Sequence, residues 1–397
     1  MLSSWHRGLT CPRSRSPGAE PGKGGGTMEQ HGEARREQLM SDLRTLYESL
    51  GYKRFSMRRF EEYALYLENK NFLKSDSVLA FTNPDGKLMA LKPDVTLSIV
   101  KHARPERLGV EKVYYKESVF RLAPTAREFV EIDQMGAEAM GAVDRYTVSE
   151  VVRLAIESLR AVGEPYVLEV SHMGFASGLM EAAGLAPEQK ERFFSLIRRK
   201  SLHELRQAVT EEGVAEPFAG WIATLADLSG PFPETLARAK AIAPAGPAVE
   251  ALEELESLYS LLAALGLADH LLLDFSMLND LDYYSGVVFQ GYVQGVPRVV
   301  LSGGRYDPLM RRFDKEGDGI GFALYLDELT RLLADRPAWD ADVLALYRET
   351  DDPVAVNAAV FALVAAGLRV FAATEPPAGF RAEKTLRFIG ADFTEVP

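Results

Sequence analysis

Residues 128–140 read EFVEIDQMGAEAM, and this stretch decides the fold. It predicts a long strand, and residues 112–120 predict a second strand beside it. Successive side chains of a strand point to opposite faces, so Gln134 and Glu138 share one face with the small Gly136 between them. A polar stripe around a glycine indicates the close approach of a ligand, and a solvated sheet face is the other interpretation of the same pattern.

Short strands and helices alternate on both sides of this stretch. Further strands are predicted at residues 78–82, 87–91, 166–170, 270–275, 286–294 and 297–301. A glycine-bearing turn is expected at Gly303 and Gly304. Apolar residues at spacings of three and four predict helices at residues 37–50 and 145–162, and Asp144 is placed to cap the second helix. Meandering strands with helices between groups of them predict an α+β fold with a largely antiparallel sheet, rather than a doubly wound parallel sheet.

The expected domains are a disordered tail at 1–37, a core at 38–173 and 266–335, a helical insertion at 174–265, and a small C-terminal β-α-β unit at 340–397. The tail is rich in Pro, Gly and Ser and has no apolar period, and Met28 offers an alternative start of the chain. The insertion carries only helical periodicity, punctuated by Gly and Pro.

The composition excludes several classes of protein. The 397 residues carry a net charge of -12, which makes nucleic acid an unlikely partner. No apolar run approaches the roughly 20 residues that a membrane span needs. Cys11 is the single cysteine, so an intrachain disulfide is excluded and a reducing cytoplasm fits the chain. The histidines lack metal-ligand spacing and no GxGxxG motif is present, so neither a metal nor a cofactor is expected.

Two segments carry polar groups that suit a small ligand. In KPDVT, at residues 92–96, Asp94 and Thr96 either cap the start of a helix or present oxygens to a ligand ammonium. In DLDYYSG, Tyr283 and Tyr284 lie beside a tight turn. They either stack on and hydrogen-bond a small ring or lie as half-buried strand aromatics.

A third segment, SGGRYD at residues 302–307, places two glycines before Tyr306. The glycines either let the backbone pass close to a ligand or form a hairpin turn.

Taken in order, the segments resemble the catalytic core of histidyl-tRNA synthetases. KPDVT resembles that family's R-P-E-G-T, IDQMGAEAMG resembles its F-H-Q-x-G-x-E-x-x-G strand, NDLDYYSG resembles R-G-L-D-Y-Y-T-G, and SGGRYDPL resembles G-G-R-Y-D-G-L. The resemblance covers about residues 38–335 and implies a class II aminoacyl-tRNA synthetase-like antiparallel sheet flanked by helices.

Departures from the family's motifs bear on its chemistry. GIGFALYLDEL, at residues 319–329, resembles the family's motif 3, G-F-A-x-G-L-E-R-L, whose arginine falls on Glu328. The arginine of R-G-L-D-Y-Y falls on Asn279. Adenylation needs cations beside the triphosphate, so the resemblance implies that ATP chemistry is lost. Arg121 of motif 2 is kept, although the loop after it is shorter. An active histidyl-tRNA synthetase-like ligase and a degenerate RNA-sensing or regulatory domain remain the alternatives.

A synthetase-like core without ATP chemistry resembles the family of ATP phosphoribosyltransferase regulatory subunits. That resemblance implies a cytoplasmic, non-catalytic subunit that the short-form catalytic subunit requires for the first step of L-histidine biosynthesis, within a hetero-octamer. It also implies feedback inhibition, with L-histidine as the effector. The implied histidine-binding residues are Asp94, Thr96, Arg121, Gln134, Glu138, Tyr283, Tyr284 and Tyr306.

The resemblance also implies which group of the ligand each of these residues would contact. Asp94, Thr96 and Gln134 would hold the α-ammonium. Glu138 would accept a hydrogen bond from the imidazole, and tyrosine hydroxyls would meet the other ring nitrogen, which suits a polar ring in a partly dry pocket. Arg121 would meet the ligand's carboxylate or serve a structural role.

Overall fold

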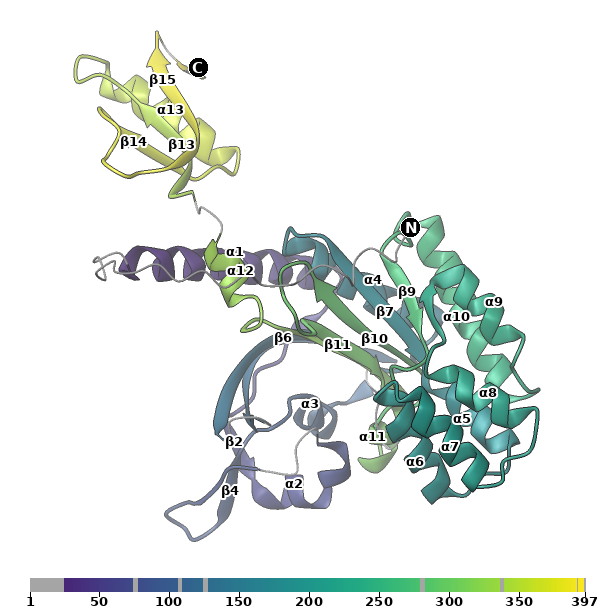
Figure 1. Cartoon of the computed structure of the whole chain (residues 1–397). Helices are drawn as coiled ribbons and strands as arrows, with labels where there is room; N and C mark the ends of the chain where they lie inside the picture. Colours follow the sequence, from purple (N-terminus) through teal and green to yellow (C-terminus); the bar gives the residue numbers. More distant parts are fainter. Residues whose placement is uncertain are drawn as a thin grey trace, which may run out of the picture. The chain divides into compact units, whose positions relative to one another are not determined.

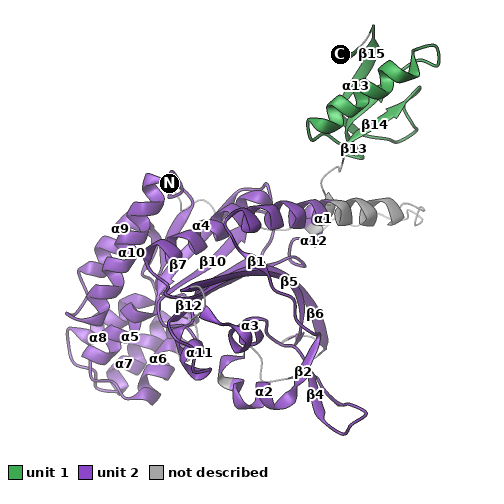
Figure 2. Ribbon diagram, turned by 180° about the vertical axis from the view of Figure 1, so that it is seen from behind, with its two compact units in different colours: residues 1–33, 337–397 green, residues 34–336 purple. Residues whose placement is uncertain are grey.

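The computed structural model describes residues 25–73, 78–105, 109–123, 128–278, 283–335, 339–390 and 392–395. The chain divides into two compact units, one of residues 34–336 and one of residues 1–33 with 337–397, which Figure 2 colours separately. Within the described ranges, no helix is long and apolar enough to cross a membrane.

The unit of residues 34–336 is built on a nine-stranded sheet (Figure 1). Its strands lie in the order β1 (Lys53–Arg54), β5 (Val110–Leu122), β6 (Phe129–Gly141), β12 (Asp318–Tyr325), β11 (Leu301–Arg305), β10 (Val287–Val293), β7 (Tyr166–His172), β9 (Leu271–Asp274) and β8 (Ser229–Pro231). Neighbouring strands are antiparallel except for β1 with β5 and β7 with β9. The sheet confirms the predicted α+β fold.

The stretch that decides the fold forms the centre of one half of the sheet. β6 pairs with β5 along thirteen residues of each strand, and β12 pairs with its other edge. Glu138 therefore has Val113 on one side and Gly321 on the other. Both ladders leave the Glu138 side chain on the face that also carries Gln134, as strand alternation predicts.

Helices cover the reverse face of these strands. Tyr47 of α1 (Gly25–Ser49) has its ring 6.0 Å from the ring of Tyr114 and 6.2 Å from that of Phe322. The Tyr47 hydroxyl is 2.8 Å from the hydroxyl of Ser158 on α4 (Arg145–Ala161), so both helices lie on this face. The Asp144 side chain accepts a hydrogen bond from Thr147 N, which confirms the predicted cap of α4.

A smaller sheet of three strands precedes the segment that lies on the opposite face of the large sheet. It consists of β2 (Phe60–Glu62), β4 (Leu88–Leu91) and β3 (Ala80–Thr82), with α2 (Tyr63–Glu68) and η1 (Lys70–Phe72) following β2. The Asn83 side chain accepts hydrogen bonds from Asp85 N and Lys87 N, which shapes the β3–β4 turn. The chain then passes directly from β4 into α3 (Thr96–His102).

The insertion at residues 174–265, which was expected to be wholly helical, contains one strand. Its helices are α5 (Met173–Ala182), α6 (Pro187–Arg198), α7 (Leu202–Glu211), α8 (Phe218–Leu225), α9 (Phe232–Lys240) and α10 (Pro247–Ala264). Between α8 and α9, β8 joins the edge of the large sheet antiparallel to β9. The strand is only three residues long and ends at Pro231, so no alternation of side chains could have revealed it.

Two further sequence predictions are corrected. α1 begins at Gly25, so residues 25–37 are helical and not disordered, while residues 1–24 of the expected tail lie outside the described residues. No proline follows Pro21 before the helix, and its first turns are rich in Glu, Gln, Ala and Arg, which favour helix. The strand expected at 297–301 instead runs through Leu301–Arg305, so Gly303 and Gly304 lie within β11 and form no turn.

The C-terminal residues build a separate small sheet. Its strand order is β14 (Val370–Ala373), β13 (Ala341–Leu346), β15 (Ala382–Ile389) and β16 (Asp392–Glu395). α13 (Pro353–Ala365) connects β13 to β14, which run parallel and form the expected β-α-β arrangement. β16, an addition to that expectation, pairs antiparallel with β15. α11 (Asp307–Arg312) and α12 (Thr330–Asp335) belong to the larger unit.

Candidate functional site: a tyrosine-lined acidic pocket

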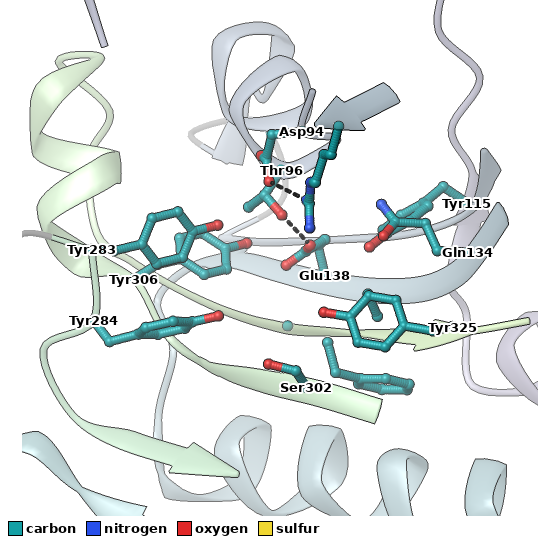
Figure 3. Close-up of a pocket in the computed structure, with 14 residues that line it drawn as sticks. Asp94, Thr96, Tyr115, Gln134, Glu138, Tyr283, Tyr284, Ser302, Tyr306 and Tyr325 are labelled. Atoms are coloured by element: carbon teal, nitrogen blue, oxygen red, sulfur yellow. Dashed lines mark hydrogen bonds and ion pairs between the residues drawn. The ribbon is translucent and has the colours of Figure 1, made fainter. Parts of the chain in front are cut away.

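A pocket of about 370 Å³, including its open mouth, lies on the face of the large sheet that α3 approaches. Figure 3 shows fourteen residues that line it. All eight residues predicted from the sequence are among them: Asp94, Thr96, Arg121, Gln134, Glu138, Tyr283, Tyr284 and Tyr306. The residues that the prediction left out are Tyr115, Ser302, Gly321, Phe322, Ala323 and Tyr325.

Glu138 occupies the floor of the pocket and is 1% exposed. Thr96 donates a hydrogen bond of 2.9 Å to its Oε1 atom. The other oxygen, Oε2, lies over Gly321 of β12, where a Cβ atom would be only 1.6 Å away. Glycine is therefore required at position 321 for the carboxylate to rest on the sheet.

The two carboxylate oxygens of Asp94 have different partners. Its Oδ1 atom accepts a hydrogen bond of 2.9 Å from Leu97 N at the start of α3. Its Oδ2 atom lies 3.6 Å from a terminal nitrogen of Arg121. Arg121 also donates from Nε to Pro93 O at 2.8 Å, which fixes the guanidinium beside the carboxylate. The predicted cap of α3 is therefore present, and the second oxygen of the same side chain lies beside Arg121 in the lining of the pocket.

Tyrosines form the walls. The ring centroid of Tyr283 lies 4.5 Å from that of Tyr284 and 6.4 Å from that of Tyr306. Burial, and then the negative charge of Asp94, raise the pKa of Tyr283 well above its ordinary value. Burial and then the charge of Glu138 do the same to the pKa values of Tyr306 and Tyr115. These hydroxyls therefore stay protonated at neutral pH and remain able to donate hydrogen bonds.

Glycines leave the space that the tyrosine side chains of the pocket occupy. A Cβ on Gly304 would lie 2.8 Å from the Tyr284 ring, and one on Gly319 would lie 2.2 Å from the Tyr306 ring. A Cβ on Gly136 would lie 2.6 Å from the Tyr115 hydroxyl. The glycine of QMGAE thus allows close approach of Tyr115 from β5, and the second glycine of SGGRYD allows close approach of Tyr284, which precedes β10.

The charges of the pocket favour a cationic ligand. Two lining carboxylates, Asp94 and Glu138, face one lining cation, Arg121, among the fourteen described residues. An ammonium group and a small ring with N–H donors match this set, because carboxylates accept and buried tyrosines both donate and accept. A triphosphate does not match it. The described residues include no group of three or more His, Cys, Asp or Glu side chains placed to hold a metal.

The structure describes one of the two positions at which the chain departs from the synthetase motifs. Glu328 lies within the described residues and its Oε1 atom is 3.3 Å from a terminal nitrogen of Arg298. The negative charge at this position is therefore already paired at the surface. Asn279 lies outside the described residues.

Comparison with known proteins places the chain in two steps. The histidyl-tRNA synthetase family model matches residues 28–329, so the chain belongs to this family, and its fold is that of a class II synthetase. A crystal structure titled as an ATP phosphoribosyltransferase regulatory subunit/histidyl-tRNA synthetase, from Bacillus halodurans, aligns with a TM-score of 0.69 at 21% identity over 87% of this chain and 90% of the other.

The second step separates two branches of the family. An ATP phosphoribosyltransferase regulatory subunit from Desulforamulus reducens is 30% identical over 366 residues, which cover 89% of each chain. The chain belongs to the ATP phosphoribosyltransferase regulatory subunits. A structure titled as the ATP phosphoribosyl transferase (HisG:HisZ) complex from Thermotoga maritima has a similar fold, with a TM-score of 0.57 and 19% identity over 73% of this chain and 97% of the other.

Proposed function

We propose that this chain binds L-histidine in the tyrosine-lined pocket, pairs with a short-form ATP phosphoribosyltransferase catalytic subunit, and imposes feedback inhibition on that subunit without catalysing a reaction itself. The observation that carries the proposal is the buried carboxylate of Glu138, held by Thr96 on the floor of a pocket that Asp94 also lines. Two acceptors at separate positions suit a molecule with an ammonium group at one end and an imidazole at the other.

The geometry supports a specific assignment of the ligand's groups to the residues that line the pocket. An imidazole N–H would donate to Glu138, with the hydroxyls of Tyr284 and Tyr306 near the opposite side of the ring. The α-ammonium would take a place beside Asp94 and Gln134. Because Arg121 already lies against Asp94, the ligand's carboxylate would find a cation next to the site of its own ammonium.

Three observations support a regulatory rather than a catalytic role. The chain belongs to a family of regulatory subunits. The pocket offers Arg121 as the cation among its described lining residues, and that guanidinium is engaged by Asp94 and Pro93. The similarly folded Thermotoga protein is named as part of a complex with a second chain. Two carboxylates and one guanidinium that is already engaged by Asp94 and Pro93 are poorly suited to stabilise the negative charge that develops on phosphates during adenylation.

Calorimetric titration of L-histidine into the full chain tests the binding site. We expect saturable binding of histidine, weak binding of histamine, which lacks the carboxylate, and no binding of L-glutamine. Glu138→Gln should weaken histidine binding by about tenfold or more, since a hydrogen bond to a charged acceptor is lost. The matched control is Glu131→Gln, an exposed carboxylate on the same strand. Equal affinities for the two variants would reject the site.

The partnership is tested separately. The short-form catalytic subunit should co-elute with this chain on size exclusion and should gain activity in forming phosphoribosyl-ATP from ATP and phosphoribosyl pyrophosphate. ATP–pyrophosphate exchange driven by histidine should be absent when the chain is assayed alone. Exchange above background would instead identify an active ligase, and co-purified RNA with no partner would favour an RNA-sensing role.

A further inference from the structure

A second pocket lies on the reverse face of the same two strands. It has a cavity volume of about 240 Å³ and lies between α1, β1, β5 and β6. Its lining includes Met40, Arg44, Arg54, Tyr114, Lys116 and Met135.

Strand alternation separates the two pockets. On β5, Tyr115 lines the first pocket while Tyr114 and Lys116 line the second. On β6, Gln134 lines the first pocket and Met135 lines the second. The backbone of two strands is therefore the wall between them, and a substitution in one lining set changes side chains on one face only.

Three cations from three different elements meet at the second pocket. Arg44 comes from α1, Arg54 from β1 and Lys116 from β5. Lys116 is 3.5 Å from Asp133, whereas Arg44 and Arg54 form no ion pair or side-chain hydrogen bond within the described residues. The lining also holds one acidic side chain, Glu37.

The surrounding sequence concentrates positive charge. Residues 34–59 contain seven Arg and Lys residues against three Asp and Glu residues, in a chain whose net charge is -12. The pKa of Tyr114 responds to the cations: burial and Glu48 raise it, and the charges of Arg54 and Arg44 act in the opposite direction. Both guanidinium groups line the same pocket as Tyr114. Cations outnumber carboxylates in the lining by three to one, and such an excess of one sign of charge attracts the opposite sign.

We propose that this second pocket binds a small anion that carries two or more phosphate groups. Two guanidinium forks and an ammonium supply the donors that phosphate oxygens accept, and arginine matches phosphate geometry in a bidentate manner. Ser41 adds a hydroxyl, and Met40 and Met135 offer adaptable apolar contacts for a ring or sugar attached to the phosphates. Inorganic pyrophosphate and the phosphate tail of a nucleotide share this chemistry.

Calorimetry with the full chain distinguishes the sources. Pyrophosphate and ATP are titrated separately, with sodium sulfate and sodium chloride at matched ionic strength as controls. We expect saturable binding of at least one phosphate compound and none of sulfate. Tighter binding of ATP than of pyrophosphate would show that the apolar contacts are used, and equal binding would assign the site to the phosphates alone. Responses that follow ionic strength, whichever anion is added, would overturn the proposal.

Variants locate the site. The double variant R44Q/R54Q should weaken pyrophosphate binding by about tenfold or more, and R44K/R54K, which keeps the charge but not the fork, should fall between it and the parent chain. The matched control is R192Q, an exposed arginine on α6. Unchanged pyrophosphate affinity in the two double variants would overturn the assignment.

The two proposals can fail independently. Because Glu138 lies on the other face of β6, Glu138→Gln should leave pyrophosphate binding at its parental value. Likewise, R44Q/R54Q should leave histidine binding intact. Should R44Q/R54Q unfold, as judged by circular dichroism, the R44K/R54K variant carries the test on its own. Loss of pyrophosphate binding in Glu138→Gln would contradict a site on the reverse face.

Discussion

Thr96, the first residue of α3, donates a hydrogen bond of 2.9 Å to Glu138 in the middle of β6. The two residues are 42 positions apart in the sequence, and both are buried. The bond joins the segment that carries Asp94 to the floor of the pocket. It also orients one carboxylate oxygen, so that the other lies over Gly321.

Thr96→Val should destabilise the fold without changing its shape. Valine has nearly the same volume, but it withdraws a donor from a buried carboxylate, which costs about 1–3 kcal/mol of unfolding free energy. Histidine affinity should fall as well, because the Glu138 carboxylate loses its orientation. Urea unfolding and calorimetry measure the two effects. A loss of stability below about 0.5 kcal/mol would show that the hydroxyl is not holding Glu138.

Gly321→Ala should abolish histidine binding while the chain stays folded. The new Cβ would lie 1.6 Å from Glu138 Oε2, so the carboxylate must leave its position. The matched control is Gly220→Ala on α8, where the nearest atom is the end of a flexible Glu216 side chain at 3.3 Å. Calorimetry with circular dichroism distinguishes the variants. Histidine affinity within about twofold of the parent in Gly321→Ala would contradict the placement of Glu138.

Asp94→Asn separates the capping role of this side chain from its charge. Asparagine caps helices about as well as aspartate, so the bond to Leu97 N and the stability should persist. The ammonium of the ligand loses its counter-charge, and histidine affinity should fall by about 10- to 100-fold. Asp144→Asn at the start of α4 is the control with the same change of charge away from the pocket. Parental affinity in Asp94→Asn would place the ammonium elsewhere.

The eight predicted residues of the pocket were implied by motifs that resemble those of histidyl-tRNA synthetases, and local patterns supported part of the set. Alternation along one strand was enough to place Gln134 and Glu138 on a common face. Tyr115 and Tyr325 carried no such signal, because only the register of β5 and β12 against β6 brings them to the site. Knowledge of which strand pairs with which would have been needed to find them.

The glycines show where local reasoning fails. Gly303 and Gly304 have the composition of a turn, yet they lie in β11 because other strands bring bulky groups against them. A Cβ on Gly303 would lie 2.6 Å from the Phe289 ring, and one on Gly304 would meet Tyr284. Glycine marks both turns and close approaches, and only the tertiary contacts distinguish the two.

Glu169→Gln should stabilise the chain at neutral pH. Burial, and then the negative charge of Asp274, raise the pKa of Glu169 above its ordinary value. The folded state therefore holds this proton more tightly than the unfolded state, and the unfolding free energy falls as pH rises from about 4.3 through the raised pKa. Above that window the variant should be more stable than the parent, and at pH 4 the difference should vanish. Urea unfolding at both pH values measures this, and a variant no more stable than the parent at neutral pH would contradict it.

The pocket should set the response of the assembled complex to histidine. Coupling between sites requires that the effector bind two states of the assembly with different affinity, and about 1–3 kcal/mol is typical. Glu138→Gln replaces the charged acceptor for the imidazole with a neutral amide, so the ratio of phosphoribosyl-ATP formation with and without histidine should approach one. Glu131→Gln should keep the parental ratio. Full inhibition of the Glu138→Gln complex by histidine would show that the effector acts at another site, such as one on the catalytic subunit.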